Sequence, residues 1–187
     1  MEKAEAREKV AEAIAGLSAK EREEKDREIA ERFFSLDEFK RAGVVLVYAK
    51  MADEVDVDAI AAKAQAMGKK LCYPITDRAR REIVLSLVRD VGSDLGPGSY
   101  GIREPKARLP VPAVKVDMVI VPGRAFDLEG NRVGRGGGYY DALMSSEGFR
   151  ARRCALAYDC QVMERVPHTA IDEKIDILVT ESRVLRF

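Results

Sequence analysis

The stretch VIVPGRAFDLEGNRVGRGGGYYD, from Val119 to Asp141, joins an apolar strand, a glycine-rich loop and the start of a helix in one continuous segment. The apolar residues predict a strand that ends at Pro122-Gly123, because proline and glycine interrupt regular structure. A polar connection then leads to the glycine-rich loop at 134–138, GRGGG, which opens a helix beginning YYDALM. This order predicts an α/β unit whose loop is able to wrap a polyphosphate.

The residue types in this loop suit phosphate for physical reasons. Glycines have no Cβ, so their backbone N–H groups can approach phosphate oxygens closely. The first N–H groups of the following helix lack internal partners and carry partial positive charge. Arg132 and Arg135 add fork-shaped cations that match phosphate, and Asp141 stands in the first helical turn, where it can hold Mg²⁺ on the same phosphates. The segment therefore predicts a site for a phosphorylated ligand and a divalent cation.

Two alternatives bear on this interpretation. The glycines would also fit a flexible surface turn, with Asp141 simply favouring the helix N-terminus. The loop matches neither common nucleotide motif, because Tyr139 occupies the third glycine position of GxGxxG and no Gly-Lys-Ser or Gly-Lys-Thr occurs in the chain. A dinucleotide or P-loop assignment is therefore unsupported.

Length and charge limit the function classes. The chain has 187 residues without a linker-like stretch, so we expect one domain spanning 1–187. Lysine plus arginine total 32 and aspartate plus glutamate total 32, so no overall field attracts nucleic acid or a membrane surface. No apolar run is long enough to span a bilayer and the N-terminus is charged, so we expect a cytoplasmic protein that acts on small molecules. The sequence leaves a monomer and a small homo-oligomer equally open.

Cysteine and histidine usage excludes several chemistries. Cys72, Cys154 and Cys160 fit neither a zinc site nor a disulfide framework, and we expect free thiols, buried in apolar segments. His168 is the only histidine, which argues against histidine metal sites and histidine-centred triads. The chemistry must rest on carboxylates, lysine and arginine.

Strands and helices alternate along the chain. The first forty residues predict a pair of helices, the second beginning after Ser18. A further helix is expected at 57–67, closed by Gly68, and the segment at 70–74 is expected to end at its proline. Short apolar strands are expected at 43–48, 70–74, 83–88, 117–122, 154–158 and 175–180. The pattern predicts a three-layer α/β fold with a mainly parallel central sheet, helices on both faces and an N-terminal helical pair.

Two further features concern function. In such sheets ligands bind beyond the carboxyl ends of the strands, where both the glycine loop and the EVD segment at 54–56 are expected. The connection at 92–113 is long and rich in glycine and proline, which is typical of a functional or disordered loop. On the first helix, Lys3 and Arg7 continue the apolar stripe formed by Val10, Ile14 and Leu17, so they either point inward to a ligand or extend to water from its edge.

The segment VPGRAFD…GNRVGRGGGYYD, with YGIREP upstream and a Gln-x-x-x-x-x-Pro pattern downstream, resembles the 5-formyltetrahydrofolate cyclo-ligase family. DEVD at 53–56, IREP at 102–105 and VTE at 179–181 agree with the family in order and spacing, so the resemblance covers nearly the whole chain. It implies an α/β enzyme that uses ATP and Mg²⁺ to convert 5-formyltetrahydrofolate to 5,10-methenyltetrahydrofolate, with release of ADP and phosphate.

The resemblance also implies roles for individual residues. Lys3 and Arg7 would contact ATP, Glu54 would contact the pterin end of the folate, and Asp141 and Asp172 would hold Mg²⁺. Arg135, Tyr139 and Asp141 would take part in catalysis, and the YGIREP loop would help to wall the pocket. The implied ATP cradle consists of Arg132, Gly134, Arg135, Gly136, Gly137, Gly138, Tyr139 and Tyr140, of which Arg135 to Tyr139 would also contact the folate.

This sequence departs from the family pattern at two places. Gly137 stands where some members carry lysine, so Arg135 or a neighbour must supply that charge, and Ile171 replaces a polar residue before Asp172. Structural roles also fit the single residues: Asp172 could cap a turn, Glu54 could be a solvated carboxylate, and the two tyrosines at 139–140 could pack the helix. A non-catalytic nucleotide- or folate-binding protein with a regulatory role is the alternative function, whereas a phosphosugar isomerase or acyl-CoA transferase lacks a matching motif.

Overall fold

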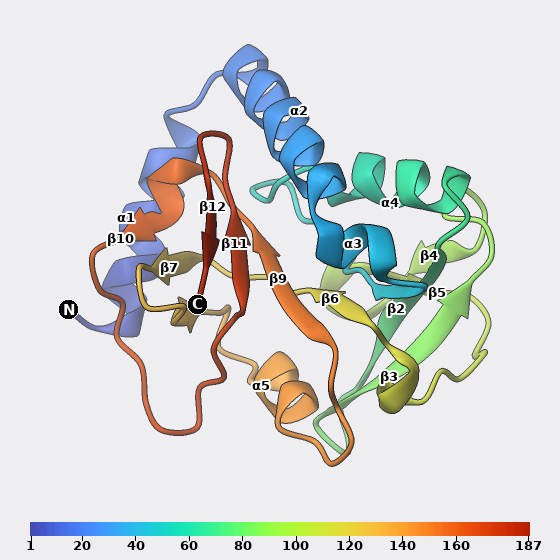
Figure 1. The fold of residues 1–187 in the computed structure, drawn as a ribbon. Coiled ribbons are helices and arrows are strands. Elements are labelled where there is room, and N and C mark those ends of the chain that lie inside the picture. Colours follow the sequence, from blue (N-terminus) through green and yellow to red (C-terminus); the bar gives the residue numbers. More distant parts are fainter.

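The computed structural model describes the backbone of residues 1–187 and every side chain except that of Tyr100. Its centre is a seven-stranded sheet with the strand order β12-β11-β9-β6-β1-β2-β3 (Figure 1). These strands are β1 (Val44–Leu46), β2 (Lys70–Asp77), β3 (Glu82–Val88), β6 (Met118–Ile120), β9 (Arg152–Leu156), β11 (Ile177–Val179) and β12 (Val184–Arg186). The strands from β11 to β2 pair in parallel, and only the edge strands β3 and β12 are antiparallel. The predicted mainly parallel sheet is confirmed.

Helices cover both faces of this sheet, as predicted. The N-terminal pair is α1 (Lys3–Ala15) and α2 (Ala19–Ser35), followed by α3 (Asp37–Arg41), α4 (Val57–Ala66) and α5 (Tyr139–Met144). Figure 1 shows α2, α3 and α4 on one face of the sheet and α5 on the other. A capping box starts α2: the Ser18 hydroxyl accepts from the Glu21 N–H, and the Glu21 carboxylate accepts from the Ser18 N–H.

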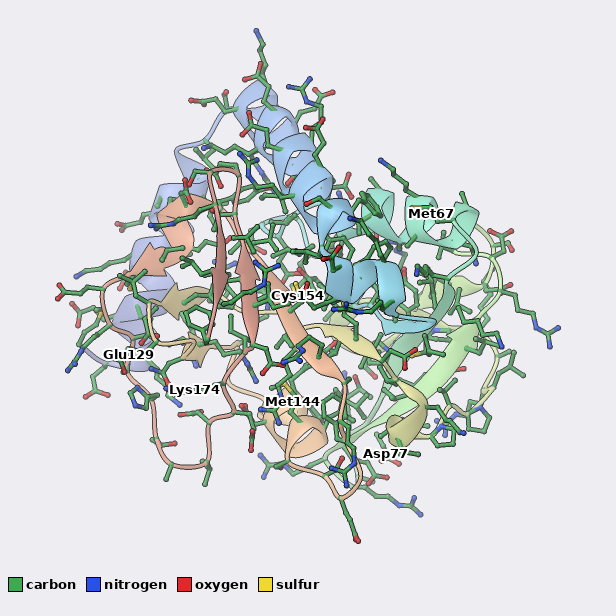
Figure 2. All side chains as sticks on the ribbon, in the orientation of Figure 1. Met67, Asp77, Glu129, Met144, Cys154 and Lys174 are labelled. Carbon is green, nitrogen blue, oxygen red and sulfur yellow. The ribbon has the colours of Figure 1, made fainter. Side chains whose placement is uncertain are left out.

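Alternation along the inner strands divides the core between the two faces. Cys154 on β9 faces the cluster that includes Val10 of α1 and Phe33 of α2, whereas the next residue, Ala155, faces the cluster that includes Met144 of α5. Figure 2 labels Cys154 on the sheet and Met144 on the helix beneath it. Because successive side chains of a strand point to opposite faces, near-continuous apolar strands signal this double burial.

The prediction that Pro74 ends its strand was wrong, because β2 continues to Asp77. Pro74 pairs with Leu85 of antiparallel β3, and the Leu85 carbonyl accepts from Val111 N–H on the far side. The pair therefore exchanges no ladder hydrogen bond. On its other side β1 has already ended at Leu46, which lies opposite Cys72. The N–H that proline lacks is not needed at this position.

Several short elements were not anticipated. The long connection at 92–113 contains a two-stranded sheet, β4 (Leu95–Pro97) and β5 (Arg103–Pro105). The polar connection after β6 forms β7 (Ala125–Asp127) and β8 (Arg132–Val133), which with β10 (Val162–Met163) make a three-stranded sheet. Short 3₁₀ turns occupy Ser99–Gly101, Ala113–Lys115 and Asp159–Gln161.

The helices and the cysteines bear on two expectations from the sequence. Among the helices that the structure describes, none combines the length and apolar character that crossing a membrane requires. All three cysteines are free thiols; Cys72 and Cys154 are buried as predicted, whereas Cys160 is half-buried. Burial raises the pKa of Cys72 to about 12, so this thiol is inert at neutral pH.

Candidate functional site

The glycine-rich loop lies at the carboxyl-end edge of the parallel sheet, carried by the β7–β8 hairpin. The hairpin is closed by a turn in which the Asp127 carboxylate accepts from the N–H groups of Glu129 and Asn131, both at 2.9 Å. The Arg124 N–H donates to the Val133 carbonyl at 2.7 Å, which fixes the two strands beside each other. The loop therefore begins from a rigid base directly after Val133.

Local geometry explains three of the glycines. Gly136 and Gly138 have φ of 103° and 70°, in the region that side chains disfavour. Gly137 has an ordinary φ, but a Cβ there would lie 2.8 Å from the Cδ2 of Tyr139, so the aromatic ring packs directly on the loop backbone. The helix that follows, α5, has only six residues. Any anion at this loop must therefore rely on loop N–H groups and neighbouring cations more than on a long helix dipole.

Arg132 and Asp141 form an ion pair beneath the loop. An Nη of Arg132 lies 2.8 Å from Asp141 Oδ1, which also accepts from the Glu173 N–H at 3.0 Å. The Arg132 side chain is only 4% exposed. Burial lowers its pKa from the ordinary arginine value, and the Asp141 carboxylate opposes that shift. Its Nε is buried without a hydrogen-bond partner among the described residues, so one donor remains for a ligand.

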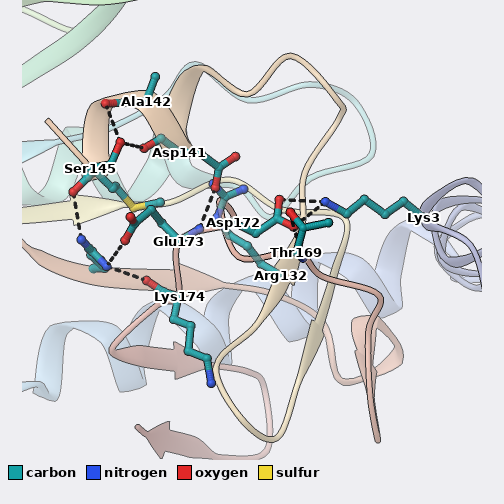
Figure 3. Close-up of polar contacts among 11 residues, drawn as sticks. Lys3, Arg132, Asp141, Ala142, Ser145, Thr169, Asp172, Glu173 and Lys174 are labelled. Carbon is teal, nitrogen blue, oxygen red and sulfur yellow. Dashed lines mark hydrogen bonds and ion pairs between the residues drawn. The ribbon is translucent and has the colours of Figure 1, made fainter.

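The first helix carries two cations to the same place. The Lys3 ammonium lies 2.7 and 2.6 Å from the two carboxylate oxygens of Asp172, and the Arg7 Nε donates to the Gly134 carbonyl at 2.7 Å. Figure 3 shows the Lys3–Asp172 pair on one side of Arg132 and Asp141 on the other. Of the two orientations that the spacing left open for Lys3 and Arg7, the structure shows the one directed at the loop. Their contact with a nucleotide stays a prediction.

Asp172 is held on both of its sides. The N–H and hydroxyl of Thr169 donate to Asp172 Oδ2 at 2.6 and 2.9 Å. Burial alone would raise the pKa of Asp172, but the hydrogen bonds from Lys3 and Thr169 outweigh it, and the pKa is lowered. The carboxylate thus caps a turn and also faces the loop, so the structural role and the functional role are compatible.

A second cluster joins the loop to the segment after β1. Arg135 donates through Nε and an Nη to Glu54 Oε1 at 3.2 and 3.0 Å, and through the same Nη to Asp53 Oδ1 at 2.7 Å. The other oxygen of Asp53 accepts from Arg124. Glu54 is buried and its Oε2 accepts from the Met51 N–H at 2.8 Å. It is therefore not the solvated carboxylate that the sequence left open.

A hollow of about 440 Å³ lies between α1 and these arginines, lined by Ala4, Arg7, Glu8, Ala11, Arg124 and Arg135. Three guanidinium groups bordering one hollow favour an anionic ligand. A second hollow of about 450 Å³ lies at the opposite edge of the sheet, lined by residues such as Asp117, Arg152 and Asp176. It contains none of the predicted site residues.

Tyr140 contributes a buried hydroxyl to the site. Burial raises the pKa of this phenol, and the nearby Glu54 carboxylate adds to the rise, so the group is neutral. Its oxygen has no hydrogen-bond partner in the part of the chain that the structure describes. An unsatisfied buried hydroxyl costs stability, so this hydroxyl is a candidate for a ligand contact. The side chain of Tyr100, in the loop expected to wall the pocket, lies outside the described residues.

Sequence reasoning missed the residues that support this site. Asp53 and Arg124 were named only as members of their segments, and their pairing depends on a hairpin that the sequence did not reveal. Arg22 of α2 donates to the carbonyls of Ala52 and Glu54 at 2.6 and 3.4 Å and so fixes the segment after β1. Its place on an otherwise highly charged helix face gave no distinguishing signal.

The carboxylates fit a magnesium ion better than a transition metal. No group of three or more histidine, cysteine, aspartate or glutamate side chains able to hold a metal occurs among the described side chains. Mg²⁺, however, usually binds one or two carboxylates together with substrate phosphates and water. Asp141 Oδ2 accepts no hydrogen bond among the described contacts, and Asp172 lies across Arg132 from it. These donors suit a hard cation bound together with a phosphate.

The structure thus gathers the predicted residues at one edge of the sheet. Four cation contacts converge on or beside the loop: Lys3 with Asp172, Arg7 with Gly134, Arg132 with Asp141, and Arg135 with Glu54. A parallel α/β sheet with a glycine loop and clustered cations at its carboxyl edge is an arrangement that suits phosphorylated ligands.

Comparison with known proteins narrows this class. The chain belongs to the 5-formyltetrahydrofolate cyclo-ligase family, whose model matches residues 1–181. It is 28% identical over 171 residues to the 5-formyltetrahydrofolate cyclo-ligase of Escherichia coli K12, covering 90% of this chain and 94% of that protein. The Mus musculus cyclo-ligase is 26% identical over 180 residues, with 90% and 88% covered.

Solved structures agree with the family assignment. The 5,10-methenyltetrahydrofolate synthetase of Aquifex aeolicus, solved by NMR, is 38% identical and superposes with a TM-score of 0.86, covering 100% of this chain and 93% of that one. The synthetase of Mycoplasma pneumoniae, at 18% identity, shares the fold with a TM-score of 0.78 over 97% of this chain and 99% of that one. The chain is therefore an enzyme of a family of ATP-dependent ligases in folate one-carbon metabolism.

Proposed function

We propose that this protein closes the imidazoline ring of 5-formyltetrahydrofolate to give 5,10-methenyltetrahydrofolate, with ATP as phosphoryl donor and Mg²⁺ as cofactor. The observation that carries the proposal is the convergence of Lys3, Arg7, Arg132 and Arg135 at one glycine loop, which leads into the helix that carries Asp141. Folate binding alone would need neither this concentration of cations nor the carboxylates paired with them.

The chemistry explains why ATP is needed. The formyl group on N5 is an amide, and its oxygen leaves poorly when N10 attacks the formyl carbon. In the proposed first step the formyl oxygen bonds to the γ-phosphorus and the bond to the β,γ-bridging oxygen breaks, releasing ADP. N10 then attacks the same carbon and loses its proton, and the carbon–oxygen bond breaks to release phosphate. The remaining electrons form the conjugated N5–C–N10 cation of the product.

This mechanism requires no side-chain nucleophile. The protein's task is to align the formyl oxygen with the γ-phosphate and to stabilise the charge on the transferring group. Arg135 and the loop N–H groups supply that stabilisation, and Lys3, Arg7 and Arg132 bind the remaining phosphate oxygens. The single histidine and the buried thiols have no role in this scheme.

Asp141 and Asp172 would hold Mg²⁺, which would neutralise phosphate charge when bound. In the structure both carboxylates are engaged by Arg132 and Lys3, the cations proposed to bind the nucleotide. Binding of the magnesium nucleotide would therefore be an exchange, in which Arg132 and Lys3 would turn from the carboxylates to phosphate oxygens. Such an exchange leaves no charge unpaired in either state, which a partly buried site requires.

The folate would lie across the loop from the nucleotide. Glu54 is the acceptor proposed for the pterin ring, and Tyr139 and the neutral hydroxyl of Tyr140 are proposed to contact the substrates. Arg135 joins the two halves, because it belongs to the phosphate loop and bonds Glu54. This connection supports a site in which the formyl group meets the γ-phosphate beside Arg135.

Isotope transfer tests the proposed mechanism. The substrate is prepared with ¹⁸O in its formyl group and converted in unlabelled water. We expect the released phosphate to carry one ¹⁸O atom, because the formyl oxygen attacks phosphorus and leaves with it. Unlabelled phosphate, formed together with the methenyl product, would contradict phosphorylation of the formyl oxygen while leaving the overall reaction intact.

A further inference from the structure

Asp53 lies between two arginines that belong to different parts of the site. Its Oδ1 accepts from Arg135 at 2.7 Å and its Oδ2 accepts from Arg124. Burial alone would raise the pKa of Asp53, but the hydrogen bond from Arg135 and the charges of Arg135 and Arg124 outweigh burial and lower it. Asp53 is therefore ionised at neutral pH. The carboxylate therefore bridges Arg124 of the hairpin and Arg135 of the loop.

Arg124 is a fixed anchor for this bridge. Its side chain is 6% exposed, its N–H donates to the Val133 carbonyl at 2.7 Å, and its own carbonyl accepts from the Gln161 side chain at 3.0 Å. Arg135, by contrast, has a side chain that is 39% exposed, although both arginines border the hollow. Asp53 thus connects a nearly buried guanidinium to a more exposed one.

The acceptor capacity of Glu54 shows when Arg135 must move. A carboxylate has about four lone-pair sites, two on each oxygen. Arg135 fills both sites on Oε1, and the Met51 N–H fills one on Oε2. A pterin ring presents N3–H and the 2-amino group as a two-donor fork, which needs one site on each oxygen. Such a ring binds Glu54 in this way only if Arg135 releases at least one of its bonds to Oε1.

We propose that Asp53 is a positioning residue that retains Arg135 at the phosphate loop when the pterin takes its place on Glu54. The inference rests on the proposed function, in which Glu54 binds the folate and Arg135 binds the transferring phosphate. Asp53 keeps one Nη of Arg135, anchored through Arg124, while the freed Nε turns toward the nucleotide. Folate binding thereby makes Arg135 available to ATP. Phosphoryl transfer then depends on the presence of the folate that receives the phosphoryl group.

The substitution Asp53→Asn tests the positioning role. We expect kcat to fall about tenfold, the factor associated with one charge-assisted hydrogen bond, with KM for the folate within about twofold of wild type. Asp53→Glu, which keeps the charge, should recover most of the lost kcat. Glu38→Gln is the matched control, because Glu38 also accepts a hydrogen bond from an arginine, Arg186 of the edge strand β12, away from the site. The kinetics of this variant should equal those of wild type.

The outcomes separate the inference from the proposed function. A wild-type protein that forms no methenyl product contradicts the proposed function itself. If wild type is active and Asp53→Asn keeps kcat within about twofold, or changes only KM, Asp53 does not position Arg135. If Asp53→Asn does not fold because Arg124 is left unpaired, the double variant Asp53→Asn/Arg124→Met removes both charges and should show the same loss of kcat.

Calorimetry with the β,γ-imido analogue of ATP tests the release of Arg135 directly. Wild type should bind the analogue several-fold tighter when saturated with 5-formyltetrahydrofolate, because the Nε of Arg135 is then released from Glu54. In Arg135→Ala the folate should make no difference to the affinity for the analogue. Equal affinities with and without folate in the wild-type protein would overturn the proposal.

Discussion

Replacing Asp141 by asparagine separates its structural role from its proposed catalytic role. Asp141 Oδ1 accepts two hydrogen bonds, from Arg132 at 2.8 Å and from the Glu173 N–H at 3.0 Å. An asparagine oxygen can accept both, so the fold should persist, but the nearly buried Arg132 loses its closest counter-charge. The charge-assisted bond becomes an ordinary one, which costs about 1–2 kcal/mol of unfolding free energy. For a chain of this size the melting temperature should fall by about 2–8 °C.

The loss of turnover should be far larger than this loss of stability. Asp141→Asn removes a ligand proposed for Mg²⁺ from the site where charge develops, and turnover should fall by about 10²–10³. The assay measures the initial rate of methenyl formation at saturating substrates, beside a thermal melt of each variant. Turnover within about threefold of wild type, with only the melting temperature lowered, would refute the reasoning and leave Asp141 a purely structural partner of Arg132.

Asp176→Asn is the matched control for this experiment. Asp176 accepts from the Arg153 N–H at 2.8 Å and has an arginine neighbour, Arg152, so its environment resembles that of Asp141. It lies at the opposite edge of the sheet, beside the hollow that contains none of the predicted site residues. This variant should lose stability and keep wild-type turnover.

Three further substitutions test separate parts of the account. Gly137→Ala puts a Cβ 2.8 Å from the Tyr139 ring, so the ring must shift, and kcat/KM for ATP should fall about tenfold in steady-state assays. Unchanged kinetics would show that the ring contact is unimportant. Tyr140→Phe removes a buried hydroxyl that has no partner among the described residues. Denaturant unfolding should therefore show no loss of stability, while kcat/KM falls about tenfold. A less stable variant with normal kinetics would contradict a ligand-binding role. Lys3→Met removes the cation that helps to lower the pKa of Asp172. Wild type should therefore exceed the variant in unfolding free energy by about 1 kcal/mol at about pH 6, and the difference should shrink below about pH 4 as Asp172 protonates. A difference independent of pH would exclude the ion pair as its cause.

Local sequence patterns were sufficient where the structure depends on local chemistry. The apolar strands at 117–122 and 154–158 predicted a doubly covered parallel sheet, and the glycines at 134–138 predicted a tight loop at its carboxyl edge. The stripe through Val10 and Ile14 predicted the face of the first helix that packs on the body of the protein, and the structure buries both residues there. In each case the spacing of residues in one element determines which way a side chain points.

Other features depend on contacts between distant segments, which spacing cannot reveal. Pro74 looked like a strand end because the chain alone does not show that its neighbour β1 stops at Leu46. Asp53 and Arg124 pair across 71 positions, and their contact requires the β7–β8 hairpin, whose strands are too short to give a periodic signal. The residues that support the site were therefore harder to predict than the residues that line it.

An absorbance time course of the purified protein with 5-formyltetrahydrofolate, ATP and Mg²⁺ tests the central claim most directly. The account predicts that the methenyl chromophore appears only when all three are present, and that omitting any one abolishes it. If the nucleotide binds but no chromophore forms under any combination, the glycine loop is a recognition site rather than a catalytic one, and the proposed reaction is wrong for this chain.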